Sequence, residues 1–289
     1  MNTMINVVKN QFPDLSKEEY SKCMSFIRDK CSEYYFCAYL ALTNGNVDDA
    51  ISFFKFDEKL RSFLLRYTLR FENQIKTDFA CEIETQTSCS SFWSNKDYYL
   101  KSAKTPKADG KPSDFTFLRR KITNWIHNAG LNLSGGYSNF VAVHACSFGS
   151  FIDLVKYIDI KYKNPFVIKS TSFLDIDHSN FTKCFPLFLT YLTCVKKLRD
   201  RCAHGSYVVT SSFDRYLSPH VKLLSNDFSP NKEKDYSMLE ITINFLLNYS
   251  NCRAEFKRGL KRLLENNIDL LEKYNGKHSF SSNPIKNLF

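Results

Sequence analysis

The segment LTYLTCVKKLRDRCAHGSY, residues 189–207, decides the fold class of this sequence. On a helical wheel at about 100° per residue, the segment and Phe188 before it gather apolar side chains into one stripe that must be buried: Phe188, Tyr191, Leu192, Val195, Leu198 and Cys202. Arg199 falls in the middle of this stripe. Because a guanidinium stays charged in any protein environment, Arg199 needs a carboxylate, a helix end or a ligand phosphate as its partner.

His204 is the second residue of interest in this segment. It follows Arg199 by five positions, so an ideal helix would place the two side chains about 140° apart. They converge only if the helix ends near His204, and Gly205, a common helix-stop residue, follows at once. An imidazole that moves protons and a guanidinium that holds a phosphate are the groups that metal-free RNA cleavage through the 2′-hydroxyl needs.

The spacing itself does not identify a nuclease. Arg-x(4–6)-His also occurs at Arg120 and His127, and at Arg215 and His220. The last pair spans a proline, which argues against a helix, whereas Arg120 and His127 lie on one predicted helix and remain a competitor. The structural alternative makes Arg199 a buried salt-bridge partner and His204 a helix-end residue, and spacing alone favours that alternative.

The composition favours a polyanionic partner. The 289 residues include 40 Lys and Arg against 30 Asp and Glu, a formal charge of +10. Such an excess attracts nucleic acid or an anionic membrane surface. No apolar run approaches the ~18 residues that span a bilayer, and the N-terminus lacks the apolar core of a signal peptide. We therefore expect a cytoplasmic protein that does not cross a membrane.

The cysteines and glycines predict neither a metal nor a cofactor. Ten cysteines are scattered singly without a C-x-x-C pair, so we expect reduced thiols, mostly in the core. The spacing of Gly130, Gly135 and Gly136 differs from that of a nucleotide-binding loop.

Apolar spacing predicts an all-α fold, because few Gly and Pro residues interrupt the helical pattern. We expect a single all-helical domain over residues 1–275, with an exposed basic loop at 101–114, and a flexible tail at 276–289. Residues 205–235 are predicted to be a long irregular segment, with a short hairpin considered at 207–209. The predicted helices cover 14–39 (one or two helices), the stretch from a turn at 44–46 to about 85, 115–129, 139–161, 183–204, 236–249 and 251–274. Ser16 followed by Glu19 predicts a capping box, and Asn46 predicts an N-cap.

The helix that ends near residue 85 has two apolar faces, which predicts a central helix or one at a subunit interface. The first face carries Leu60, Phe63, Leu64, Tyr67 and Phe71, and the second carries Leu65, Leu69, Glu72, Lys76 and Ile83. Glu72 and Lys76 are four residues apart in the favourable order. The structural alternative for them is an ordinary surface ion pair.

Four ordered segments resemble the AbiD/AbiF-like abortive-infection proteins of the HEPN superfamily. Residues 189–207 resemble that family's Leu-Arg-Asn-x-Cys-Ala-His segment, and residues 55–83, KFDEKLRSFLLRYTLRFENQIKTDFACEI, resemble its Phe-Asp-x-x-Leu-Arg … Ile-Glu-x-x-Leu-Arg helix. Residues 141–158, VAVHACSFGSFIDLVKYI, are similar to its Phe-Gly-x-Leu helix. Residues 33–42, EYYFCAYLAL, are similar to its Tyr-Tyr-Arg-Leu-x-x-Tyr segment.

The resemblance implies a HEPN-like helical bundle with Arg199 and His204 as the nuclease pair and Glu72 as their acidic neighbour. It further implies metal-independent RNA cleavage, a toxin role in phage defence, and a homodimer that joins two such pairs across its axis. An RNA partner follows, either a substrate or a small non-coding RNA. The alternative is a non-catalytic RNA-binding protein of the same fold that holds a small RNA.

Three positions depart from the family pattern. Asp200 stands where Asn is usual, which either weakens phosphate binding or is offset by a pair with Arg201. Lys76 replaces an Arg, which keeps the charge but loses the planar fork. Gly205 replaces a second His, so His204 must suffice.

Basic clusters predict where RNA would lie. One helix repeats cations on the face opposite Phe256, Leu260 and Leu264: Arg253, Lys257, Arg258, Lys261 and Arg262. A second cluster joins the 101–114 loop to Arg119, Arg120 and Lys121, and Lys76 and Arg201 complete the predicted RNA contacts. Such binding should weaken steeply with salt, and the alternative for each cluster is a solvated helix face.

Overall fold

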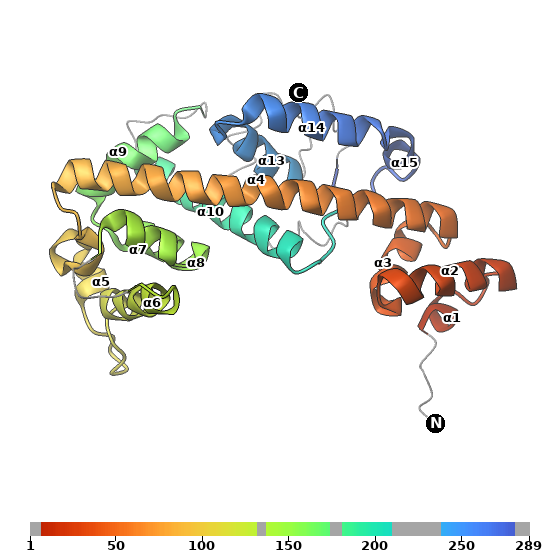
Figure 1. Ribbon diagram of the computed structural model, residues 1–289, viewed down its shortest axis with the longest axis horizontal. Helices are drawn as coiled ribbons and strands as arrows, with labels where there is room; N and C mark the ends of the chain where they lie inside the picture. The colour runs from red at the N-terminus through yellow and green to blue at the C-terminus, as the bar shows by residue number, and fades with distance from the viewer. Residues whose placement is uncertain (1–6, 132–136, 174–180, 210–237, 281–289) are drawn as a thin grey trace.

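The protein is built from helices, as the sequence predicts. The computed structural model describes residues 7–131, 137–173, 181–209 and 238–280, and Figure 1 shows their arrangement. These ranges form thirteen α-helices and two 3-10 helices. They contain no strand, only an isolated antiparallel bridge between Tyr99 and Ile158. No helix within them is both long enough and apolar enough to cross a membrane.

One helix, α4 (Val47–Thr87), runs along the molecule, and most other helices pack against it (Figure 1). The predicted turn precedes it, with positive φ at Asn44 and Gly45. The Asn46 side chain then accepts a hydrogen bond from the Asp49 N–H at 3.0 Å and caps the helix. Both predicted faces are largely buried, which confirms a central helix, although Leu69 on the second face is 42% exposed.

Three helices gather at the N-terminal end of α4: α1 (Val7–Gln11), α2 (Lys17–Lys30) and α3 (Glu33–Leu42). The predicted capping box is present, since the Ser16 N–H donates to Glu19 at 2.9 Å and the Glu19 N–H donates back to the Ser16 hydroxyl at 3.2 Å. The region 14–39 forms two helices because Ser32 caps α3 through the Tyr35 N–H.

The other end of α4 is surrounded by seven short elements: η1 (Phe92–Ser94), η2 (Lys96–Tyr98), α5 (Lys101–Lys104), α6 (Asp114–Asn128), α7 (Asn139–Ala145), α8 (Phe148–Tyr157) and α9 (Ile160–Thr171). The single helix predicted over 139–161 is wrong. The helix is interrupted at Cys146, because the Ser147 hydroxyl accepts a hydrogen bond from the Ser150 N–H at 3.2 Å and caps the start of a new helix, α8. The apolar period continues through this break, so it is invisible in the pattern.

The predicted basic loop at 101–114 is partly helical. Residues 101–104 form α5, in which Ala103 is buried, and residues 105–112 are exposed. Lys107 pairs with Asp114 at 2.8 Å and Lys111 pairs with Asp109 at 2.6 Å. The exposed part therefore uses two of its lysines on neighbouring carboxylates.

The helix predicted from residues 189–207 is α10 (Phe181–Ala203), which packs against α4. Its apolar stripe is buried as the wheel predicts, with Tyr191, Leu192, Val195 and Leu198 each fully covered. Of the irregular stretch that follows, only residues 205–209 are described, and the considered hairpin at 207–209 is a bend.

The C-terminal helices cover α4 on the side away from α6 (Figure 1): α13 (Met238–Tyr249), α14 (Arg253–Glu265) and α15 (Ile268–Lys273). Phe256 stacks on Tyr67 with ring centroids 4.3 Å apart. Part of the predicted flexible tail is instead fixed against the fold, since His278 and Phe280 are buried and the Ser279 N–H donates to the Val209 carbonyl at 2.6 Å. Residues 281–289 lie outside the described residues.

Candidate functional site

The predicted Arg199 and Glu72 meet where α10 packs against α4. An Arg199 nitrogen, Nη2, lies 3.4 Å from Glu72 Oε2, and the side chains are 30% and 8% exposed. Neither Glu72 Oε2 nor Arg199 Nε has a hydrogen-bond partner among the described residues. The carboxylate expected for a cation on a buried stripe is therefore present, in a geometry that leaves hydrogen-bonding capacity unused.

Lys76 holds the other side of Glu72. Its Nζ lies 2.7 Å from Glu72 Oε1 and donates to the Cys146 carbonyl at 2.8 Å, at the end of α7. Only 3% of the Lys76 side chain and 8% of the Glu72 side chain are exposed, so the alternative of an ordinary surface pair is wrong. Lys76 is one of the predicted RNA contacts, but its ammonium group is covered. In this arrangement Lys76 positions Glu72.

Asp200 occupies much of the remaining reach of Arg199. Its Oδ1 lies 2.8 Å from Arg199 Nη1, and its Oδ2 lies 2.5 Å from Lys196 Nζ. Burial works to raise the pKa of Asp200, but hydrogen bonds from Lys196 and Arg199 hold it below its ordinary value. The considered pair with Arg201 is not formed; Arg201 Nη1 donates to the Tyr207 carbonyl at 2.9 Å.

His204 lies one residue beyond the last residue of α10, and its side chain is exposed. Gly205 has φ 68°, and the Ser206 N–H donates to the Arg201 carbonyl at 2.9 Å. This 6→1 bond with a left-handed glycine is a Schellman stop, as the sequence predicts. No hydrogen bond or ion pair joins the imidazole to Arg199 within the described part of the chain, so the ring faces solvent from the helix end.

The segment that follows His204 is fixed by a buried carboxylate that the sequence analysis did not single out. Asp57 Oδ1 accepts the backbone N–H groups of Val208 at 3.0 Å and Val209 at 2.8 Å. Asp57 Oδ2 accepts from the Tyr39 hydroxyl at 2.7 Å and lies 3.0 Å from Arg61 Nε. The helical wheel of α4 could have identified Asp57. This carboxylate lies one turn before Leu60 on the first apolar face, where a charged residue is unexpected.

The predicted basic clusters are largely at the surface. On α14, Arg253, Arg258, Lys261 and Arg262 are exposed and Lys257 is half-buried, opposite the buried Phe256, Leu260 and Leu264. On α6, Arg119 and Arg120 are exposed, and Lys121 lies with Nζ 4.7 Å from the centre of the Phe117 ring. Figure 1 shows α6 and α14 on opposite sides of α4, so the two clusters do not merge into one patch.

The competing pair, Arg120 and His127, lies on α6. Both side chains are exposed on α6, a helix that packs on α5, α7 and α8. Among the residues that the structure describes, neither side chain pairs with a buried carboxylate of the kind that faces Arg199. Arg215 and His220 lie outside the described residues.

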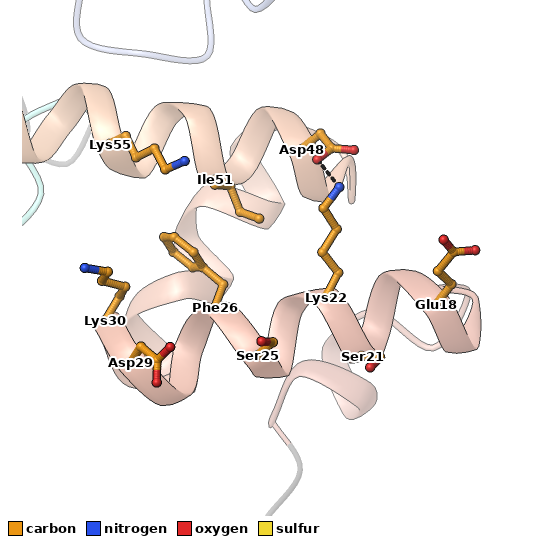
Figure 2. Close-up of a pocket in the computed structure, with 10 residues that line it drawn as sticks. All are labelled: Glu18, Ser21, Lys22, Ser25, Phe26, Asp29, Lys30, Asp48, Ile51 and Lys55. Atoms are coloured by element: carbon orange, nitrogen blue, oxygen red, sulfur yellow. Dashed lines mark ion pairs between the residues drawn. The ribbon is translucent and has the colours of Figure 1, made fainter.

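One surface hollow lies away from the predicted catalytic residues. A hollow of about 850 Å³ lies between α2 and the start of α4 (Figure 2). It is lined by Phe26 and Ile51 together with charges of both signs, and Lys22 pairs with Asp48 across it. No residue of the predicted catalytic set lines it. Mixed charge and openness give it no preference for an anionic ligand.

Comparison with known proteins adds the family. The family model described as "Abi-like protein" matches residues 20–210, which include α4, α10, Glu72, Arg199 and His204. A search of curated proteins and a search of solved structures each returned no match. The family model covers more than half of the chain, so the protein belongs to the Abi-like family, which is associated with abortive infection.

Proposed function

We propose that this protein is an abortive-infection endoribonuclease of the HEPN type, acting as a cytoplasmic toxin in phage defence. The observation that carries the proposal is the contact of Arg199 with buried Glu72 one turn before His204 ends α10. His204 adds an exposed imidazole five residues further along the chain, on a backbone that the stop at Gly205 fixes. Two groups with different chemistry, held on one helix end, are what phosphodiester cleavage needs.

The proposed chemistry uses the RNA as its own nucleophile. His204 takes the proton of a 2′-hydroxyl, the 2′-oxygen attacks the adjacent phosphorus, and the bond to the 5′-oxygen breaks. The products are a 2′,3′-cyclic phosphate and a 5′-hydroxyl, whose proton comes from an imidazolium. Arg199 stabilises the charge that develops on the phosphate oxygens, and Glu72, held by Lys76, orients the guanidinium.

A homodimer is part of the proposal. One imidazole cannot act as base and acid at the same moment, and this chain carries Gly205 where the family's second histidine is common. A second copy across a two-fold axis would supply the acid from its own His204. The exposed cations of α14 and α6 would bind the RNA backbone on either side.

The test is cleavage of labelled RNA by purified protein in excess EDTA. We expect a 2′,3′-cyclic phosphate end, and loss of cleavage in Arg199→Ala and in His204→Ala, with unchanged circular dichroism. His127→Ala is the matched control, because it removes another exposed histidine, the one of the competing pair. Full cleavage by His204→Ala, or loss of cleavage in His127→Ala, would contradict the assignment.

One observation favours the alternative function, a non-catalytic protein that holds a small RNA. Asp200 and Glu72 both contact the Arg199 guanidinium, which leaves it fewer free N–H groups for a phosphate. In that case the basic faces alone would bind RNA. Purification from the host without nuclease treatment, followed by sequencing of any RNA that co-elutes, tests this; tight salt-sensitive binding without any cleavage would favour it.

A further inference from the structure

Asp57 is a fully buried carboxylate that lies in none of the predicted catalytic positions. It stands on α4 and binds its own helix and two other parts of the chain at once. Tyr39 on α3 and Arg61 on α4 hold one oxygen, and the backbone of Val208 and Val209 holds the other. Burying a carboxylate this completely is costly, and the four donors offset that cost.

The two backbone donors lie four and five residues after His204. A segment leaving a helix through a left-handed glycine has no helical hydrogen bonds of its own to fix it. Here the Val208 and Val209 N–H groups are satisfied by Asp57, and the Val209 carbonyl accepts from the Ser279 N–H. The path of the backbone beyond His204 therefore depends on Asp57.

Further contacts lock the residues between His204 and Val208. Tyr207 stacks on Tyr35 with ring centroids 4.5 Å apart and planes at 17°. A Cβ built on Gly205 would lie 3.3 Å from Arg61 Nη1, so the guanidinium bound to Asp57 lies close beside the turn. His204 is thus held between the last turn of α10 on one side and this anchored segment on the other.

We infer that Asp57 is a positioning residue for His204: it anchors the segment after α10 and thereby fixes the imidazole at the helix end. The inference rests on the proposed function for its catalytic consequence. Asp57 itself touches neither Arg199 nor His204 in any described contact, so its action passes through the backbone of residues 205–209. Displacement of a reacting group by about 1 Å costs on the order of 100-fold in rate, so loss of this anchor should act mainly on kcat.

The test compares Asp57→Asn with a destabilising control far from the anchor. Asn keeps the size of Asp57 but presents an amide N–H₂ to donors on one side. Leu118→Ala removes a buried side chain from α6, which packs on α5, α7 and α8. Both variants are assayed at a temperature where each is folded, by native-state amide exchange and by RNA cleavage kinetics.

For Asp57→Asn we expect exchange of the Val208 and Val209 amides to accelerate by about tenfold or more, since one charge-assisted bond each is weakened. We expect kcat to fall by about 100-fold with KM within about twofold. The His204 ring resonances should broaden or shift. Leu118→Ala should keep wild-type exchange at both amides, wild-type ring resonances and wild-type kcat. Tyr39→Phe, which removes one bond and no backbone contact, should lie between wild type and Asp57→Asn.

Three results would overturn the inference: unchanged amide protection in Asp57→Asn, lost protection with wild-type kcat, or an equal loss of kcat in Leu118→Ala. If wild-type protein cleaves no RNA, the proposed function fails instead. The anchor is then still decided by the amide exchange and by the His204 resonances, which need no activity.

Discussion

Replacement of Asp200 by Asn should strengthen RNA binding. The Asp200 carboxylate lies 2.8 Å from Arg199 Nη1, on a guanidinium that a phosphate would use. A phosphate bonded to Arg199 beside it would have its centre at roughly 6 Å, where two unit charges repel by about 3 kcal/mol at an effective dielectric constant near 20. Asp200 is 29% exposed and shares its charge with Lys196, so we take about half of that value.

The remaining ~1.5 kcal/mol corresponds to about tenfold in Kd. The assay is fluorescence anisotropy of a labelled single-stranded RNA at one fixed low salt concentration, with both proteins in a His204→Ala background so that no cleavage intervenes. Asp269→Asn on α15 is the control, because it removes an equal charge from an exposed position. The same affinity in Asp200→Asn as in its parent, or the same gain in Asp269→Asn, would refute the reasoning.

Three further predictions concern stability, measured as the free energy of unfolding in urea. Lys76→Met should lower it by about 3 kcal/mol or more, because Glu72 would keep its burial and lose its main partner; a drop below about 1 kcal/mol would contradict this. Gly259→Ala should lower it by about 1–3 kcal/mol, since the added Cβ would lie 2.6 Å from Phe63 Cε2; a gain in stability would show that Phe63 moves freely. Wild-type stability should fall as pH drops below about 6.5, and a His278→Gln variant should lose this part of the slope.

The pH effect follows from how His278 is bonded. Burial lowers the pKa of His278, while the hydrogen bond to the Leu271 carbonyl opposes that shift. The Phe280 N–H donates to Nδ1 at 3.2 Å, so Nε2 carries the proton and donates to the Leu271 carbonyl at 2.8 Å. Because the folded pKa lies below the unfolded value of about 6.5, the contribution is present above that value. It is lost as pH falls through the folded pKa.

The helical pattern predicted most of the fold because apolar spacing and helix caps depend on residues that are close together in the sequence. The Ser16 capping box, the Asn46 cap and the Gly205 stop each need only a few neighbouring residues, and all three are confirmed. The break between α7 and α8 was missed because Ser147 lies within a continuous apolar period. The apolar pattern alone cannot decide whether such a serine caps a new helix or lies inside a longer one.

The candidate site was predicted only in part. The wheel showed that Arg199 needs a carboxylate, and the structure supplies Glu72. The burial of Lys76 could not be foreseen, since it depends on the Cys146 carbonyl, 70 residues away in sequence. Asp57 was missed for the same reason, because its partners Val208 and Val209 lie 151 and 152 residues away in sequence. Long-range polar contacts leave no local period in a sequence.

The hydrogen bond from Ser279 to Val209 has a consequence for where this protein can be cut. The family model ends at residue 210, but Val209 is tied to the chain's far end, and Phe256 covers Tyr67 on α4. A fragment that stops at residue 210 would expose Tyr67 and would remove the Ser279 N–H that bonds the Val209 carbonyl. The segment that the family model matches is therefore shorter than the segment that packs together, and domain swaps within the family should exchange residues through at least 280.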